Sequence, residues 1–369
     1  MIGAGLTGLY AAWRLALLGR EVMVLEQSAV AAGASGGPGR RGVRANGRDR
    51  RELPLMARAY RLWPDLADET GHPTGYQRTG QLHLTEHPED MGALGAQAGA
   101  QAAAGVPSVV VEGPGLRHLE PELSDRVVAA VHCPLDGVAD HTATTRGLAA
   151  AARRAGAELR EGVGVGELRW SRDRIGAVTG EGDLVEAGTA VVAANAGAQA
   201  LLASGGIVLP VFPVFPQVLV SPPLERTCVR HLIGHAHRRL ALKTLPGGEV
   251  MITGGWLGRW DADEKGGVVV PDAVAGNLAD AAAVFPSLAG VEVALAVADR
   301  AEAVSRDLVP IIDRVPGADN AFFATGWSGH GWAIGPVVAE LLVEWVTTGR
   351  RPPLLAPFAL ERFSAASGA

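Results

Sequence analysis

Cysteine is scarce in this chain of 369 residues, which contains only Cys133 and Cys228. The two are far apart in the sequence, and neither belongs to a C-x-x-C motif or to a Cys/His cluster. The sequence therefore supports neither a disulfide framework nor a zinc site. We expect reduced thiols, no bound metal and a cytoplasmic protein.

An excess of positive charge is also missing, because 33 lysines and arginines are opposed by 39 aspartates and glutamates, for a net charge of −6. This balance argues against a nucleic-acid-binding surface. No apolar run reaches the roughly 18 residues that a membrane-spanning helix needs. The apolar first 19 residues could suggest a signal peptide, but they lack a basic start and contain Arg14. We expect neither a nucleic-acid partner nor a membrane partner.

The composition is otherwise that of a globular chain, with 48% hydrophobic residues. Its length favours about two domains. The 49 glycines and 23 prolines follow no repeat and separate periodic segments, as turns do in an ordered α/β protein.

A β-α-β unit is predicted at the start of the chain. Met1-Ile2 precedes Gly3, a helical pattern covers residues 6–18, and an apolar strand covers 21–25. The first strand is unusually short. Two explanations stay open at this point, a late start of the chain or a truncated strand.

The glycines Gly3, Gly5 and Gly8 form a G-x-G-x-x-G pattern between that strand and that helix. This context is typical of dinucleotide binding, in which the pyrophosphate meets the N-terminus of the helix. Glu26, at the end of the second strand, is placed to accept hydrogen bonds from ribose hydroxyls. The pattern does not distinguish NAD from FAD, and a glycine-rich turn in an unrelated α/β protein is the alternative.

Alternation and helical periodicity predict the remaining elements. Several short antiparallel strands are expected in the Pro/Gly-punctuated segment 210–255. We predict helices over 51–69, 92–104, 140–155, 271–284 and 333–347, and strands over 76–84, 157–161, 165–170, 175–179, 189–194, 291–297 and 321–325.

The small-residue stretch AGASGGPGRRG that follows Glu26 decides between the cofactors. With it, the sequence resembles the FAD-dependent amine and amino-acid oxidases, the family of glycine oxidase, sarcosine oxidase and D-amino-acid oxidase. The resemblance extends over nearly the whole chain. It is carried by the motifs GAGLTG, GASG, YQRTGQLHL, CPLDGVAD, VVAANAG, LPVFPVFPQ, DLVPIID and GWSGHGWAIGP.

The resemblance implies an α/β fold with a Rossmann-type FAD-binding domain built from discontinuous segments, and an α+β substrate domain with an antiparallel sheet. We assign residues 1–80, 140–205 and 300–369 to the FAD-binding domain, and 81–139 and 206–299 to the substrate domain.

It also implies the residues that hold the cofactor. No cysteine follows Cys228, so we expect FAD to be bound without a covalent link. His330 is either a flavin contact or a histidine held within its turn. The cofactor-binding residues expected from the resemblance are Gly3, Gly5, Leu6, Thr7, Gly8, Glu26, Gln27, Ser35, Gly36, Arg40, Arg41, Val165, Asn195, Gly197, Gly326, Ser328, Gly329, His330, Gly331 and Trp332.

The chain departs from the glycine oxidase branch where that branch binds its substrate carboxylate. Glu302 and Gly329 stand at the two positions that are arginines there. Arg44 follows Arg41 in the loop 40–44 at the spacing of an arginine pair in the sarcosine oxidase branch, which implies a substrate-binding role, with a solvated basic surface as the alternative. The candidate substrate-binding residues are Arg44, Trp256, Arg300, Glu302 and Trp327.

The expected activity is oxidation of the C–N bond of an amino acid or secondary amine, such as an N-substituted glycine, by hydride transfer to FAD and hydrolysis of the imine. Oxygen is the expected acceptor, although neither Lys243 nor Lys265 aligns convincingly with the lysine that promotes the oxygen reaction in the sarcosine oxidase branch. The alternatives are a dehydrogenase that passes electrons to another acceptor or subunit, and a flavin-binding scaffold without turnover. A homo-oligomer is a further expectation.

Overall fold

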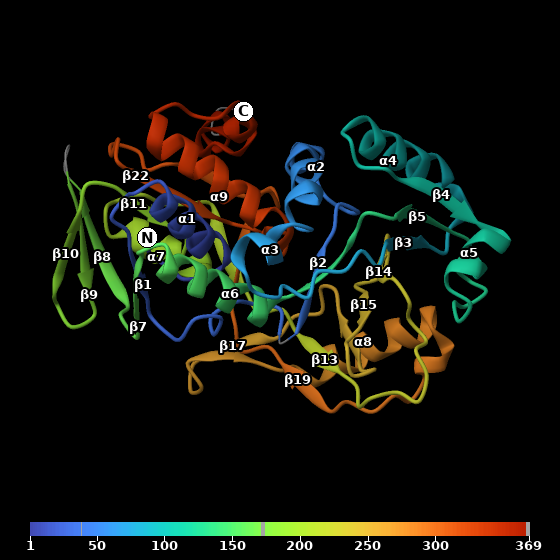
Figure 1. Cartoon of the computed structure of the whole chain (residues 1–369). Helices are drawn as coiled ribbons and strands as arrows, with labels where there is room; N and C mark the ends of the chain where they lie inside the picture. Colours follow the sequence, from blue (N-terminus) through green and yellow to red (C-terminus); the bar gives the residue numbers. More distant parts are fainter. Residues whose placement is uncertain (38, 171–173, 367–369) are drawn as a thin grey trace.

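The computed structural model describes residues 1–37, 39–170 and 174–366. Two groups of elements lie side by side in Figure 1, one around the helices α1, α6 and α9 and the other around a large sheet flanked by α4, α5 and α8. The helices are α1 (Leu6–Leu17), α2 (Leu53–Leu62), α3 (Leu66–Thr70), α4 (Met91–Ala103), α5 (Gly113–Leu119), α6 (His141–Arg154), α7 (Ala198–Ala203), α8 (Pro271–Val284) and α9 (Gly331–Thr348).

Parallel strands form the layer behind α1. Strand β1 (Met23–Glu26) pairs in parallel with β7 (Glu158–Glu161). Strand β11 (Ala190–Val192) pairs in parallel with β22 (Ala321–Thr325), which pairs in antiparallel fashion with β21 (Ile311–Arg314). Ile2 forms parallel bridges to both Leu25 and Val192, and thereby links the two sets of strands.

The large sheet has eight strands, and all but one of its neighbouring pairs are antiparallel. This confirms the predicted mixed α/β fold, whereas the exact domain boundaries stay a prediction. The strand order is β19 (Leu295–Val297), β13 (Val218–Val220), β16 (Val250–Thr253), β15 (Ala241–Thr244), β14 (Leu232–His235), β3 (Gln81–Thr85), β5 (Ala129–Cys133) and β4 (Val109–Glu112).

Four small sheets complete the structure. Of these, the three-stranded meander lies at the left edge of Figure 1. The small sheets are the meander β8 (Val165–Trp170), β9 (Ile175–Thr179) and β10 (Leu184–Ala187), and the pairs β2 (Arg40–Val43) with β6 (Gly137–Asp140), β12 (Val211–Val214) with β20 (Glu302–Ser305), and β17 (Arg259–Asp261) with β18 (Gly266–Val268).

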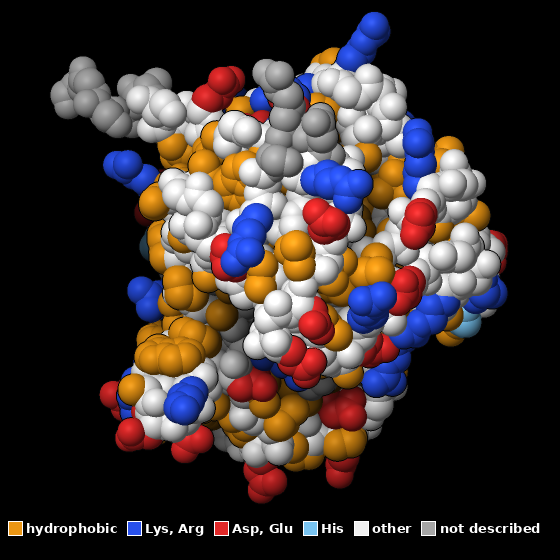
Figure 2. Space-filling view, turned by 90° about the vertical axis from the view of Figure 1, so that its left-hand side faces the viewer, with side chains coloured by type: hydrophobic (Ala, Val, Ile, Leu, Met, Phe, Trp, Pro, Cys, Tyr) orange, Lys and Arg blue, Asp and Glu red, His pale blue; other side chains and the backbone are white. Residues whose placement is uncertain are grey.

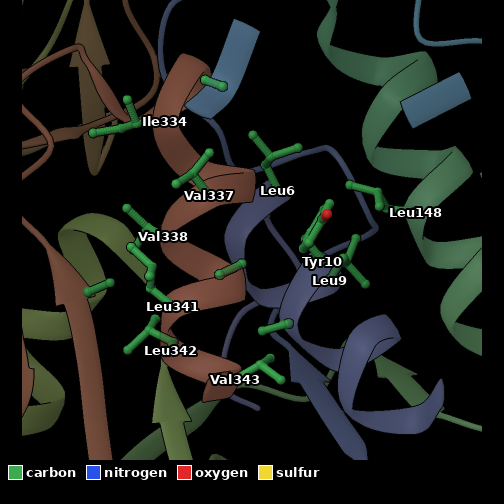
Figure 3. Close-up of a cluster of buried hydrophobic side chains, with 14 of the residues drawn as sticks. Leu6, Leu9, Tyr10, Leu148, Ile334, Val337, Val338, Leu341, Leu342 and Val343 are labelled. Atoms are coloured by element: carbon green, nitrogen blue, oxygen red, sulfur yellow. The ribbon is translucent and has the colours of Figure 1, made fainter. Parts of the chain in front are cut away.

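The main hydrophobic core lies where α1 packs between α6 and α9. Figure 3 shows Leu6 of α1 beside Val337 of α9, and Leu9 and Tyr10 of α1 on the side that faces Leu148 of α6. These side chains are 8% exposed or less. Their burial removes most of their apolar surface from water, at roughly 25 cal/mol per Å², and holds the start of α1 in place.

The helix predicted over 51–69 is wrong as one element. The structure has a 3₁₀ turn followed by α2 and α3, with a break at Pro64. Proline has no backbone N–H, so the carbonyl of Tyr60 loses its helical donor. Arg78 Nη2 replaces that donor with a hydrogen bond of 2.9 Å to the Tyr60 oxygen.

Three further local predictions need correction. The strand predicted over 76–84 begins only at Gln81, and Gln77 forms an isolated bridge to Val138. The expected loop 40–44 is mostly strand, because β2 pairs with β6 from a distant part of the chain. The strand predicted over 291–297 is shortened to β19.

Positive and negative side chains are interspersed on the face that Figure 2 shows. No helix among the described residues is long and apolar enough to span a membrane.

Candidate flavin site

A cavity of about 410 Å³ opens at the N-terminus of α1. Its lining comes from chain segments that are far apart in the sequence, among them the glycine turn, the end of β1, the stretch 33–35, and the turn before α9. The predicted residues that line it are Gly3, Gly5, Leu6, Thr7, Glu26, Gln27, Ser35, Arg41, Val165, Asn195, Gly197, Glu302, Trp327, Gly329, Gly331 and Trp332.

The three glycines of the first turn differ in their surroundings. Gly3 has φ of 99°, which disfavours a side chain. A Cβ atom at Gly8 would lie 2.1 Å from the Gly3 oxygen, so Gly8 allows α1 to pack closely on the turn. A Cβ atom at Gly5 would meet nothing within 4 Å. The open space beside Gly5 is where a pyrophosphate can approach the helix N-terminus.

Glu26 binds the glycine turn directly. Its carboxylate accepts hydrogen bonds from the backbone N–H of Ala4, at 2.7 Å, and of Ser28, at 3.0 Å. The side chain therefore has a fixed orientation at the end of β1, where ribose hydroxyls would be bound.

Glu302 accepts three hydrogen bonds at the cavity. Its Oε2 accepts hydrogen bonds from Ser35 Oγ at 2.5 Å and from Asn195 Nδ2 at 3.2 Å. Its Oε1 accepts one from the backbone N–H of Gly329 at 2.8 Å. One carboxylate on β20 thus links three segments that line the cavity.

Arg41 of β2 also lines the cavity and contacts the same Ser35 segment as Glu302. Its guanidinium donates to backbone oxygens of Ser35 and Gly37. Burial lowers the pKa of Arg41 to about 10, so this side chain remains charged at neutral pH. His141, the first residue of α6, also lines the cavity, and burial lowers its pKa to about 3.

The residues present fit an FAD molecule. Two buried donors that belong to cavity-lining residues, Trp332 Nε1 and Arg41 Nε, have no partner among the described residues. A buried donor without a partner is costly, and acceptor atoms of a ligand would satisfy it. These two donors and the open space at Gly5 suit a cofactor that carries phosphates and many hydrogen-bond acceptors.

The structure favours the interpretation that His330 is held within its turn over the interpretation that it contacts the flavin. Its Nδ1 lies 3.0 Å from Glu52 Oε1, and its carbonyl oxygen accepts a hydrogen bond of 2.9 Å from Arg48 Nη2. Burial lowers the pKa of His330 to about 4. Its ring is therefore held from behind the turn, and His330 does not line the cavity.

Other predicted residues also lie outside the cavity lining. Gly8 and Gly326 support it through backbone packing, since a Cβ atom at Gly326 would lie 3.1 Å from Ser305 and Val211. Ser328 Oγ donates to the Gly326 oxygen and shapes the same turn. The predicted cofactor residues outside the lining are Gly8, Gly36, Arg40, Gly326, Ser328 and His330.

Several basic side chains also lie near the end of β2, outside the residues that line the cavity. Arg44 Nη1 donates to the Asn46 oxygen at 2.6 Å, and burial lowers the pKa of Arg44 to about 10. Lys243 of β15 is half-buried, and burial together with the nearby Arg41 and Arg44 lowers its pKa to about 7. Burial and the charge of Arg44 also lower the pKa of His83, on β3, to about 4.

Two predicted substrate residues lie elsewhere. Trp256 packs on Gly276 of α8 and donates from Nε1 to Asp280 at 2.9 Å, so the structure does not bring it to the cavity. Arg300 lies at the edge, with Nη1 3.5 Å from the Ala34 oxygen. His141 and Lys243 were not among the predicted site residues. Only the position of His141 directly after the Asp140 N-cap of α6 offered a signal.

Cys133 and Cys228 are both buried, and neither lines the cavity. Non-covalent binding of the cofactor stays a prediction.

Comparison with known proteins agrees with this geometry. The family described as FAD dependent oxidoreductase matches residues 1–345. The chain is 33% identical over 162 residues to a D-amino acid dehydrogenase of Methylobacterium radiotolerans, an alignment that covers 43% of this chain and 39% of that protein. Its alignments span 39%, 40% and 46% of the lengths of three such dehydrogenases.

Solved structures resemble the chain over nearly its whole length. L-proline dehydrogenase from P. horikoshii has a TM-score of 0.88 and 25% identity, with 99% of this chain and 96% of that chain covered. Glycine oxidase from Geobacillus kaustophilus has a TM-score of 0.86 and 24% identity, with 98% and 97% covered, and shows the shared fold. The chain therefore belongs to the family of FAD-dependent oxidoreductases.

Proposed function

We propose that the protein oxidises the C–N bond of an amino acid or secondary amine that carries a carboxylate, such as an N-substituted glycine, and that oxygen reoxidises the flavin. Bound FAD supplies the hydride acceptor for this chemistry. The side chains of the chain bind and orient the substrate and keep water away.

The observation that carries this proposal is the group of three cations formed by Arg41, Arg44 and Lys243. Both arginines donate only to backbone oxygens, and no carboxylate of the described residues forms an ion pair with any of the three. Buried cations without an anion are costly. Glu302 acts on Arg41, and Asp136 on Arg44, through space without forming an ion pair, so a substrate carboxylate would supply the directly paired anion.

Arg44 is our proposed anchor for that carboxylate, because a planar guanidinium can bind both carboxylate oxygens at once. Trp327 and Trp332 line the cavity and limit the access of water to it. Glu302 is proposed to hold together the chain segments that line the cofactor cavity, because its carboxylate already accepts three hydrogen bonds from them. A carboxylate does not attract the substrate carboxylate, so we assign that binding role to Arg44.

A dehydrogenase is the second candidate, and the comparisons favour it on one point. The relative from Methylobacterium radiotolerans is named D-amino acid dehydrogenase, and the structural neighbour from P. horikoshii is named L-proline dehydrogenase. A dehydrogenase would reduce the flavin with the amine substrate in the same way as an oxidase, but it would pass the electrons to an acceptor other than oxygen.

The test is anaerobic bleaching of the bound flavin by glycine, sarcosine, D-amino acids, L-proline and bulkier N-carboxymethyl amines, followed by admission of oxygen. We expect bleaching by a carboxylate-bearing secondary amine and rapid return of the yellow colour in oxygen. Bleaching without rapid recovery would indicate the dehydrogenase. A flavin that no amine bleaches would contradict the proposed activity and favour a binding scaffold.

A further inference from the structure

Three aromatic side chains connect the cofactor cavity with the surface of the protein. Trp332, in the first turn of α9, lines the cavity and is half-buried. Its ring centroid lies 5.3 Å from that of Trp63, which follows the last residue of α2 and is fully buried. The Trp63 ring lies 5.9 Å from the ring of Tyr76, with an angle of 26° between the two planes. We call Trp332, Trp63 and Tyr76 the aromatic series.

The fold brings these rings together from distant parts of the sequence. Helix α2 packs beside α9, as Figure 1 shows. Trp63 Nε1 donates a hydrogen bond of 2.8 Å to the carbonyl oxygen of Ala333, the residue after Trp332, and this bond holds the Trp63 ring against the start of α9. Both ring separations are those of aromatic side chains in direct contact. Because electron transfer slows steeply with distance, rings in contact offer a fast route for an electron.

Tyr76 forms the outer end of the aromatic series. Its side chain is half-buried, and its hydroxyl oxygen accepts an exposed hydrogen bond of 3.4 Å from Arg78 Nε. Since Arg78 is the donor, the phenol proton of Tyr76 is free to face water. Burial raises the pKa of Tyr76, so the phenol keeps this proton at neutral pH.

The three side chains differ in where a proton can go when an electron is removed. The indole N–H of Trp63 faces only a neutral amide oxygen, and Trp332 Nε1 is buried without a partner among the described residues. Neither indole therefore has a base of this chain to take its proton, and each remains a strong oxidant once it has lost an electron. Oxidised Tyr76 can release its proton to water. This proton loss makes Tyr76 the stable end of the series.

We propose that the aromatic series conducts electrons from the surface to FAD in the cofactor cavity when blue light excites the flavin. Flavins accept single electrons, and excitation makes them oxidants strong enough to oxidise an indole. Trp332 gives one electron to the flavin, Trp63 replaces the electron of Trp332, and Tyr76 replaces that of Trp63 and releases its phenol proton to water. A thiol in solution then returns one electron and one proton to Tyr76. In total the thiol loses one electron, which reaches the flavin, and one proton, which reaches water.

Trp327 also lines the cavity but does not belong to the aromatic series. Within the described part of the chain, its ring contacts no other aromatic ring. An electron taken from Trp327 would return to it, which quenches flavin fluorescence but leaves no lasting product. The specific sign of the aromatic series is therefore a lasting oxidised tyrosine.

The test illuminates the FAD-loaded protein with blue light in the absence of oxygen. Trp63→Phe and Tyr76→Phe interrupt the aromatic series at its middle and at its end. Trp345→Phe and Tyr10→Phe are the matched controls, because Trp345 and Tyr10 neither line the cavity nor contact the series. Loss of the flavin absorption with dithiothreitol present measures the light-driven reduction. Electron paramagnetic resonance of samples frozen under illumination without thiol detects the oxidised side chain.

We expect the parent protein and both controls to bleach in the light and to show a tyrosyl radical signal, which narrows when tyrosine with a deuterated ring is incorporated. Trp63→Phe and Tyr76→Phe should bleach severalfold more slowly and should lack the signal. Tyr76→Phe, at the half-buried end, provides the test should Trp63→Phe fail to fold. A Tyr76→Phe protein that bleaches at the parent rate, or that still forms a tyrosyl radical, would overturn the proposal.

The inference depends on bound FAD but not on the proposed amine oxidation. Bleaching by an amine in the dark, measured on the same samples, tests that oxidation separately. A protein that an amine bleaches in the dark, but that light and thiol do not bleach, would retain the proposed function and refute the role of the aromatic series. A protein without bound flavin would contradict both.

Discussion

Ser35 Oγ donates a hydrogen bond of 2.5 Å to Glu302 Oε2, although the two residues are 267 positions apart. Glu302 lies on β20 and Ser35 lies in the stretch after β1, so this bond joins two of the segments that surround the cofactor cavity. Asn195 and Gly329 donate to the same carboxylate. The shape of the cavity therefore depends on one buried acid.

The Glu302→Ala substitution should weaken FAD binding. It leaves the buried donors of Ser35, Asn195 and Gly329 without their acceptor, and each such donor costs about 1–3 kcal/mol. We expect the Kd for FAD to rise at least roughly tenfold. Glu302→Gln keeps one acceptor oxygen and should lose less. Fluorescence titration of the apoprotein measures both. Normal FAD affinity combined with lost flavin reduction would instead place Glu302 at the substrate.

The Gly5→Val substitution should abolish FAD binding and leave the fold intact. A side chain at Gly5 has free space in the protein but occupies the approach of the pyrophosphate. Gly8→Ala is the matched contrast, because its Cβ atom would lie 2.1 Å from the Gly3 oxygen and should lower the Tm even of the apoprotein. Circular dichroism and flavin content distinguish the two effects. A Gly5→Val protein with full flavin content would show that the cofactor lies elsewhere.

Arg44→Ala should lower kcat/KM roughly ten- to a hundred-fold, since a charge-assisted hydrogen-bonded pair contributes about 1.5 to 3 kcal/mol. FAD content should not change, because Arg44 does not line the cofactor cavity. Arg44→Lys should recover part of the loss, as it restores charge without the planar fork. Arg300→Ala, at the edge of the cavity, is the control. Normal kinetics in Arg44→Ala with a loss in Arg300→Ala would move the carboxylate site to Arg300.

Lys243→Met should change how stability depends on pH. Burial, with Arg41 and Arg44, lowers the pKa of Lys243 from 10.5 to about 7. Between these values the unfolded chain binds more protons than the folded protein, so this lysine makes the free energy of unfolding rise with pH. Without substrate, Lys243→Met should therefore have a higher Tm than the parent protein at pH 7, and the difference should shrink toward pH 10.

Thermal unfolding at several pH values measures this effect. Lys265→Met, in the exposed turn between β17 and β18, is the control and should not reproduce the difference. A Tm difference for Lys243→Met that stays constant from pH 7 to pH 10 would contradict the prediction.

The sequence alone determined the parts of the site whose residues are close together in the chain. Gly3, Gly5, Gly8 and Glu26 belong to one β-α-β unit, and the local geometry of that unit dictates where glycine is needed and where an acid is useful. The long helix α9 and the antiparallel strands could be predicted from the spacing of their apolar residues, because each element buries one or two of its faces and that burial is visible in the local sequence. These predictions needed no knowledge of distant contacts.

Only the tertiary structure decided how distant segments meet. The strand β2 exists because β6, almost a hundred residues later, supplies its hydrogen-bond partner. His330 faces Glu52, Glu302 joins three segments, and Lys243 lies near Arg41 and Arg44. Each of these relationships pairs residues whose side-chain types are common on any surface. Their charges and hydrogen bonds acquire a role only when folding removes water from between them.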